Sequence, residues 1–238
     1  MKLKHITFTG VDSKTDINRL KEIIELYPIA EFGVLTSYHW QENGNRYPDP
    51  STFNKLLNLT PHLSLHLCGK IAHDAAHGRW PLVNEHTGFR LPIFRRIQLN
   101  IAERTDNPIH CYSAPYGRQE LIIQTKDAKN VSVYARTRAY YADTKNNAIS
   151  MLLDASGGRG IDTQLQVFPT RNKIGYAGGL NPENVAEKLS YLIENVKNGC
   201  FWIDMESGVR TNDWFDLDKV VRVLEICQPI IESRKGAI

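Results

Sequence analysis

The sequence predicts a closed (β/α)8 barrel, and three observations carry this prediction. The length of 238 residues is close to the ~250 residues typical of that fold. Eight short apolar segments alternate with helical patterns to the end of the chain, which favours a parallel sheet. Small glycine turns follow the seventh and eighth of these segments, where such barrels usually hold phosphate. We find no linker or low-complexity tract, so we expect a single domain over residues 1–238.

The composition narrows the class of protein. Hydrophobic residues make up 42% and charged residues 23%, which is typical of a chain with a sizeable core. The net charge of +3 favours no nucleic-acid partner, whereas a phosphorylated small molecule would suit it. No apolar run approaches the ~20 residues of a membrane helix, and the N-terminus lacks a signal-peptide pattern. The four cysteines form no CxxC pair, so we expect a reduced, cytoplasmic protein; its oligomeric state is open.

The first half of the chain contains four strand candidates. They cover residues 5–9, 32–37, 63–68 and 96–100, and helices are expected over 12–27, 51–58 and 70–78, the first capped by Asp12 or Ser13. Residues 79–94 have the pattern of an irregular or helix-loop segment. In a barrel strand one parity faces the interior, so Thr9, Cys68 and Asn100 are expected to point inward at strand ends.

The second half contains the other four strand candidates. They cover residues 121–125, 150–154, 174–177 and 201–206, with helices over 184–195 and 216–226. A glycine-rich loop over 155–160 follows the sixth strand. Residues 127–147 have no clear pattern.

The turn after the seventh strand has the features of an anion site. Gly178 and Gly179 allow a close approach of the backbone to a ligand. Asn181-Pro182 then starts a helix, and the free N–H groups at that start suit an anion.

Asp154 is the foremost candidate for chemistry, because a carboxylate at the end of an apolar strand is placed for general acid or base catalysis. The structural alternative is that it caps the next helix or pairs with Arg159. Asp204 and Glu206 share an inward parity. Asp204 lies deeper, where a buried and hydrogen-bonded carboxylate is the structural alternative.

A metal site is a weaker interpretation of the histidines. His73 and His77 would share one face of a helix, and His66 or Cys68 could supply a third ligand. The intervening glutamate of a zinc-protease motif is missing. We therefore expect an exposed histidine pair, with no metal and no cofactor.

Taken together, these motifs resemble phosphoribosylanthranilate isomerase, a (β/α)8 barrel of the tryptophan pathway. Thr7-Phe8-Thr9-Gly10-Val11 is similar to the family's Lys-Ile-Cys-Gly-Ile, and Ile97-Gln98-Leu99-Asn100 to its Val-Gln-Leu-His. Leu152-Leu153-Asp154 with the Gly157-Gly158-Arg159-Gly160 loop resembles its Leu-Leu-Asp and later glycine loop. Ala177 to Val185 resembles its phosphate loop, and Ile203-Asp204-Met205-Glu206-Ser207-Gly208-Val209 its Val-Asp-Val-Ser-Ser-Gly-Val.

The resemblance implies a phosphate held by backbone N–H groups of Gly178, Gly179, Ser207 and Gly208. It also implies an Amadori rearrangement of an aminoribose phosphate, with Asp154 as general acid. Further substrate contacts are implied for Arg46, whose family counterpart meets the anthranilate carboxylate, and for Asn100, Gly157, Gly158 and Arg159.

The family's cysteine base is replaced by Thr9. A threonine hydroxyl titrates far above neutral pH and is a poor base without a partner. One hypothesis is that Cys68 supplies the thiolate from a neighbouring strand; the alternative is that Cys68 is a small buried residue.

Three functions remain open from the sequence. The first is a phosphoribosylanthranilate isomerase-like enzyme, of isomerase or related lyase type. The second is a non-catalytic barrel that binds a phosphoribosyl ligand. The third is a metal-dependent hydrolase.

Overall fold

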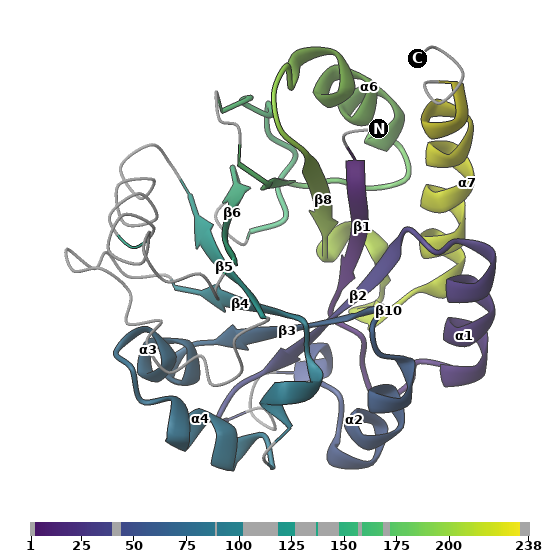
Figure 1. Ribbon diagram of the computed structural model, residues 1–238. Coiled ribbons are helices and arrows are strands. Elements are labelled where there is room, and N and C mark those ends of the chain that lie inside the picture. The colour runs from purple at the N-terminus through teal and green to yellow at the C-terminus, as the bar shows by residue number, and fades with distance from the viewer. Residues whose placement is uncertain are drawn as a thin grey trace.

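Eight parallel strands close into one barrel in chain order (Figure 1). The computed structural model describes residues 3–39, 44–88, 90–101, 119–126, 137, 148–156, 159–168 and 172–233. The strands are β1 (Leu3–Thr9), β2 (Ala30–Thr36), β3 (Leu63–Cys68), β4 (Arg96–Asn100), β5 (Glu120–Thr125), β6 (Ala148–Asp154), β7 (Ile174–Ala177) and β8 (Phe201–Met205). Pairing of β8 with β1, with Ile203 opposite Ile6, completes the ring. The predicted (β/α)8 barrel is confirmed.

Helices surround the strands in Figure 1, with α1 and α7 neighbours on one side and α3 and α4 on the other. They are α1 (Ile17–Leu26), α2 (Pro50–Leu56), α3 (Lys70–Ala76), α4 (Trp80–His86), α6 (Val185–Asn195) and α7 (Leu217–Ser233). Short 3₁₀ turns lie at Gly44–Arg46, Leu57–Leu59, Leu91–Ile93 and Ser207–Val209, and a small ribbon pairs β9 (Arg210–Thr211) with β10 (Trp214–Phe215). Residues 79–94 are thus a helix-loop segment. Of the unassigned residues 127–147, only Thr137 lies within the described residues.

The start of α1 differs from the prediction. The helix begins at Ile17, and Asp16 caps it by accepting hydrogen bonds from two backbone N–H groups of the first turn. Asp12 is fully buried and instead pairs with Arg210, its Oδ2 lying 3.1 Å from the guanidinium Nη2. Ser13 Oγ accepts from the N–H of Asp49 at 2.7 Å. Both predicted caps are therefore wrong, because long-range partners hold these side chains.

Alternate residues of each strand point to opposite sides of the sheet: one set faces the surrounding helices and the other faces the inside of the barrel. Apolar residues such as Ile6, Phe8 and Leu65 belong to the core cluster that includes buried residues of the surrounding helices. The opposite parity carries polar groups into the barrel, for example Thr9 and His66, which line its cavity. Because the two parities separate so cleanly, the inward residues at the strand ends converge on one face of the barrel.

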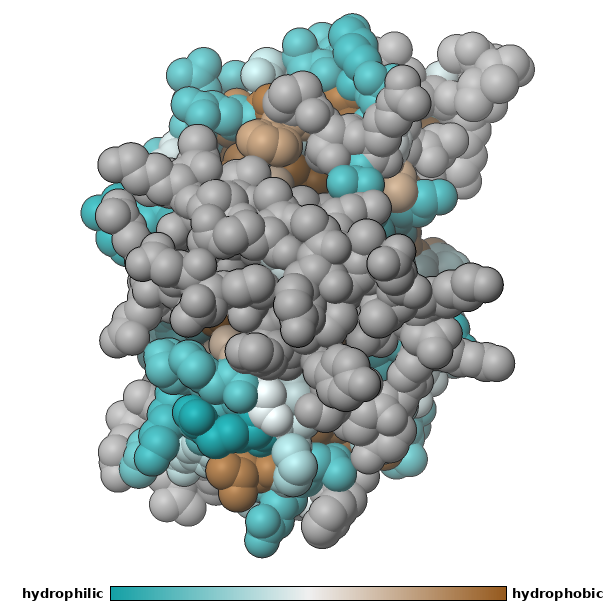
Figure 2. All heavy atoms as spheres, turned by 60° about the vertical axis from the view of Figure 1, so that its left-hand side comes forward, coloured by the Kyte–Doolittle hydropathy of each residue, from teal (hydrophilic) through white to brown (hydrophobic). Residues whose placement is uncertain are grey.

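Among the residues coloured in Figure 2, hydrophilic ones predominate on the side shown, and hydrophobic ones appear in separate patches. No helix within the described ranges has the length and apolar character needed to cross a membrane.

Candidate functional site

A cavity of about 450 Å³ lies among the carboxyl ends of the strands, within the usual size range of small-molecule sites. Of the residues predicted from the sequence, it is lined by Thr9, Arg46, Cys68, Asn100, Asp154, Arg159, Gly178, Gly179 and Ser207. Gly208 lies in the turn next to Ser207, and Gly157 and Gly158 fall outside the described residues. The predicted groups are therefore brought together at the barrel face where catalytic groups lie.

Asp154 ends β6 and is buried beside the cavity. Its Oδ1 accepts from the N–H and the hydroxyl of Ser156 at 3.0 and 2.8 Å, and its Oδ2 accepts from Gln124 Nε2 at 2.9 Å. Arg159 Nε donates to the carbonyl oxygen of Ser156 at 2.9 Å. The carboxyl group is thus oriented by its own turn and by β5. Sequence reasoning missed Gln124, although its inward parity on β5 was a usable signal.

Thr9 and Asp204 form a second polar pair in the cavity. The Thr9 hydroxyl donates to Asp204 Oδ1 at 2.8 Å, across the junction of β1 and β8. Burial raises the pKa of Asp204 to about 8, and the neighbouring Glu206 carboxylate adds to this rise. The predicted inward direction of both side chains is confirmed.

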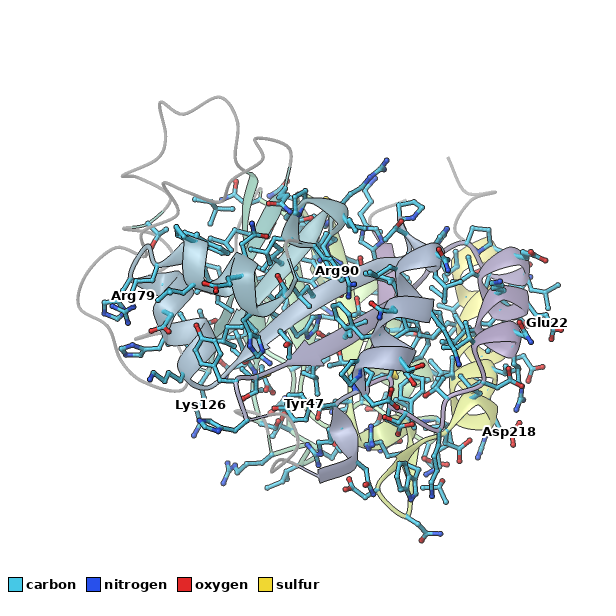
Figure 3. All side chains as sticks on the ribbon, turned by 90° about the horizontal axis from the view of Figure 1, so that it is seen from below. Glu22, Tyr47, Arg79, Arg90, Lys126 and Asp218 are labelled. Carbon is cyan, nitrogen blue, oxygen red and sulfur yellow. The ribbon has the colours of Figure 1, made fainter. Side chains whose placement is uncertain are left out.

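Cys68 lies in the cavity as expected, with Asn100 Nδ2 at 3.4 Å from its sulfur. A side-chain hydrogen bond also joins its sulfur to Tyr47, which lies near the middle of the molecule in Figure 3. Burial raises the pKa of the Cys68 thiol to about 12, and the charge of Glu206 acts in the same direction. A thiol in these surroundings is protonated near neutral pH, which counts against Cys68 as the base.

The glycine turns after β7 and β8 pack backbone against backbone. Gly179 has φ +69°, and a Cβ there would lie 2.4 Å from the backbone nitrogen of Asp162. A Cβ on Gly208 would lie 2.0 Å from the carbonyl oxygen of Leu180. Glycine is thus required at both positions, and the loops after β6, β7 and β8 form one closely packed corner.

The start of α6 corrects one expectation. Asn181 Oδ1 accepts from the N–H groups of Glu183 and Asn184 at 2.9 and 3.0 Å, so these groups are not free for an anion. Within the described residues, no hydrogen bond is donated by the N–H groups of Gly178 or Gly179. Backbone N–H groups without a hydrogen bond are therefore found in the glycine turn, whereas those of Glu183 and Asn184 are already bound.

Arg46 forms an ion pair with Glu206, a partner that the sequence did not predict. Its Nη1 lies 2.8 Å from Glu206 Oε1, and its Nε lies 3.6 Å from Asp213 Oδ1. Burial raises the pKa of Glu206, while the nearby Arg46 and Arg210 oppose the rise. Glu206 occupies the position of a serine in the motif that it resembles, and this departure was the available signal.

The histidines do not converge. The rings of His73 on α3 and of His77, the residue that follows α3, stack with centroids 4.3 Å apart. His66 is buried inside the barrel. Among the described residues, no group of three or more His, Cys, Asp or Glu side chains could hold a metal ion. A metal-dependent hydrolase therefore has no support from these residues.

The fold and cavity define a (β/α)8 barrel whose candidate site combines carboxylates with closely packed glycine turns after the last two central strands. Residues 117–226 match the family model described as N-(5'phosphoribosyl)anthranilate (PRA) isomerase. The curated N-(5'-phosphoribosyl)anthranilate isomerase of Komagataella pastoris is 36% identical over 83 residues, which are 33% of this chain and 32% of that protein. The chain is thus similar to N-(5'-phosphoribosyl)anthranilate isomerases over this part of its length, and the predicted resemblance is confirmed.

A solved structure supports the fold over nearly the whole chain. The N-(5'-phosphoribosyl)anthranilate isomerase of Pyrococcus furiosus aligns with a TM-score of 0.50 and 21% identity, covering 94% of this chain and 98% of that one. The match with the Komagataella protein spans about a third of that protein's length. The structural likeness therefore bears on the architecture alone.

Proposed function

We propose that the protein is an isomerase that carries out an Amadori-type rearrangement of a phosphoribosyl compound, with N-(5'-phosphoribosyl)anthranilate as the substrate to test. The observation that carries this proposal is the placement of Asp154 in the same cavity as the glycine turns after β7 and β8. The family match over residues 117–226 supports it. Because phosphorylated sugars are charged and are retained inside cells, we expect the protein to work in the cytoplasm.

The substrate phosphate would lie against the corner formed by Gly178, Gly179, Ser207 and Gly208. Backbone N–H groups in such turns bind anions without a counter-charge from a side chain. Anchoring the phosphate there would leave the ribose and the aromatic amine to extend across the cavity toward Asp154 and Arg46.

Asp154 would act as the general acid. Its proton passes to the furanose ring oxygen, the bond between C1 and that oxygen breaks, and the nitrogen lone pair forms a C1=N bond. The hydrogen bonds from Ser156 and Gln124 orient the carboxyl group, and an oriented acid contributes about 10²–10⁴-fold to such a step.

The direct experiment follows the loss of anthranilate-linked fluorescence when purified protein is mixed with freshly made N-(5'-phosphoribosyl)anthranilate. Turnover is expected. Thermal stabilisation by the phosphosugar without turnover would contradict the proposal and favour the non-catalytic binding barrel instead.

Replacing Glu206 by serine tests the role of Arg46. The ion pair between them is partly exposed, and such pairs contribute about 0.2–1 kcal/mol. Releasing Arg46 for the substrate carboxylate should therefore lower KM for N-(5'-phosphoribosyl)anthranilate about 1.4- to fivefold. Arg46→Met in the same assay should raise KM. Equal KM values in all three proteins would mean that Arg46 does not meet the substrate.

Gly179→Ala tests the phosphate corner. The new Cβ meets backbone atoms at 2.4 Å, so the loops after β6 and β7 must move apart and the affinity for inorganic phosphate, measured by calorimetry, should fall at least tenfold. Gly88→Ala is the matched control, because Gly88 has a similar φ of +62° but its Cβ would meet nothing closer than 3.8 Å. The control should lose about 1 kcal/mol of stability and keep its phosphate affinity. Equal losses of affinity in both variants would show that backbone strain alone is responsible.

A further inference from the structure

We propose that Asp204 is the catalytic base that removes the proton from C2 of the substrate, and that Thr9 is the positioning residue that holds its carboxylate. This assignment rests on the proposed isomerase function. Asp204 would replace the cysteine base of the family motif, because this chain has Thr9 at the position of that cysteine.

The first argument is geometric. Asp204 and Thr9 both line the cavity, and the Thr9 hydroxyl donates to Asp204 Oδ1 at 2.8 Å. Asp154 lies on β6 and Asp204 on β8, with β7 between them in the barrel order. A ligand anchored by Gly178 and Gly179 at the end of β7 would therefore have one carboxyl group on each side.

The second argument is elimination among the other groups of the cavity. The Thr9 hydroxyl is too weak an acid to be ionised near neutral pH. The pKa of the Cys68 thiol is raised to about 12 by burial, so its thiolate is scarce. Glu206 is bound to Arg46, and Asp154 is already required as the acid.

The surroundings of Asp204 suit a base. Burial raises its pKa to about 8, and the charges of Glu206 and Glu31 act in the same direction. The Thr9 hydrogen bond and the charge of Arg96 on β4 oppose the rise. A carboxylate with a raised pKa accepts a proton more strongly than an ordinary one and still ionises near neutral pH.

The remaining charged or titratable groups of the cavity face it from other strands and loops. His66 on β3 has its pKa lowered to about 3 by burial, so it is neutral over the working pH range. The cations Arg46, Lys126 and Arg159 line the same cavity from its loops. Between pH 7 and 9, ionisation of Asp204 would therefore give the site a carboxylate that can act as a base.

The chemical step balances without any further reagent. After ring opening, the Asp204 carboxylate takes the C2 proton. The C2–H electron pair forms a C1=C2 bond, and the C1=N electron pair returns to nitrogen. The enol hydroxyl proton passes to the Asp154 carboxylate while Asp204 gives its proton to C1, which yields the ketose and restores both groups. Atoms and charge are conserved overall, as an isomerisation requires.

The test begins with the pH dependence of kcat/KM for N-(5'-phosphoribosyl)anthranilate. In the wild-type protein it should rise through a midpoint near pH 8. Thr9→Val removes a hydrogen bond to the ionised carboxylate, which raises the pKa of Asp204, and should move the midpoint about one pH unit higher. Thr9→Ser keeps a hydroxyl and should leave the midpoint in place. A structural role of Thr9 would not separate these two variants, and unchanged midpoints in both would overturn the assignment.

Asp204→Asn is the second arm. Its kcat should fall at least 100-fold, while its affinity for a reduced, non-reacting product analogue stays within threefold of wild type. Turnover within tenfold of wild type in this variant would overturn the role of Asp204 and leave the isomerase function standing. No turnover by the wild-type protein would overturn the proposed function, and the assignment of Asp204 with it.

Discussion

Asp154→Asn should lower kcat for the rearrangement of N-(5'-phosphoribosyl)anthranilate by about 10²–10⁴-fold, which is the usual contribution of a positioned general acid. Asparagine keeps the shape of the side chain and can still accept a hydrogen bond from Ser156, but it has no proton to give to the ring oxygen. Binding of a reduced product analogue should change little, since the phosphate corner lies after β7 and β8. The measurement is steady-state turnover by fluorescence, with calorimetry for the analogue.

Asp218→Asn is a suitable control for this substitution. Asp218 is exposed on α7, pairs with Arg19 and lies on the outside of the molecule in Figure 3. The same chemical change there should leave kcat and KM unchanged. If Asp154→Asn retained more than a tenth of the wild-type kcat, Asp154 would not be the acid.

The barrel could be predicted from the sequence because strand parity is a local signal. In residues 63–68 the leucines alternate with Ser64, His66 and Cys68, and period two is sufficient to place one set against the helices and the other inside the barrel. The same rule correctly placed Thr9, Asn100 and Asp154 at one face. Because the carboxyl ends of parallel strands lie at the same end of the barrel, these three residues are expected in one cavity.

Contacts between distant segments could not be predicted in this way. Asp12 looked like a helix cap, but it meets Arg210, which lies 198 positions further along the chain. The pairing of Arg46 with Glu206 depends on the loop after β2 reaching the end of β8. Local propensity contains no information about which of several possible partners a charged side chain meets, so these contacts required the three-dimensional structure.

The helix start after β7 shows a subtler limit. Asn181-Pro182 predicted a helix start, but these residues lie in a turn and α6 begins only at Val185. Helix starts generally offer N–H groups to anions. Here the side chain of Asn181 already accepts two of those N–H groups. The motif therefore indicated a region for phosphate, and within it the described N–H groups that donate no hydrogen bond are those of Gly178 and Gly179.

The other end of the barrel carries a network of buried charges. Arg96 is buried and pairs with Glu31 and with Glu120, the latter at 3.1 Å. Its guanidinium lies 4.6 Å from the ring centroid of Trp202, and Lys173 meets Glu120 at 2.7 Å. These groups fill the barrel interior with paired charges, although Arg96 Nη2 and Glu120 Oε1 have no hydrogen-bond partner among the described residues. We expect the ion pairs to hold the strands that carry the catalytic residues in register.

Arg96→Met should destabilise the protein by about 3–5 kcal/mol, because removing one partner of a buried ion pair leaves a buried charge uncompensated. The midpoint of thermal unfolding should fall by roughly 6–20 °C for a chain of this size. Denaturant unfolding at pH 7 gives the difference in free energy. Arg95→Met is the matched control: Arg95 is the exposed neighbour, and its loss should cost less than about 0.5 kcal/mol.

The pH dependence of the difference in unfolding free energy between wild type and Arg96→Met shows whether the lost ion pair or lost packing causes it. Although burial alone raises the pKa of Glu31, the Arg96 guanidinium outweighs it and lowers the pKa to about 2. A carboxyl group with a depressed folded-state pKa contributes stability above its unfolded pKa of 4.5, and this contribution is lost as the pH falls toward 2. In Arg96→Met the Glu31 pKa rises instead, so acid neutralises the unpaired charge. The gap between wild type and variant should therefore shrink from pH 7 to pH 3, whereas a gap that stayed constant would point to lost packing against Trp202.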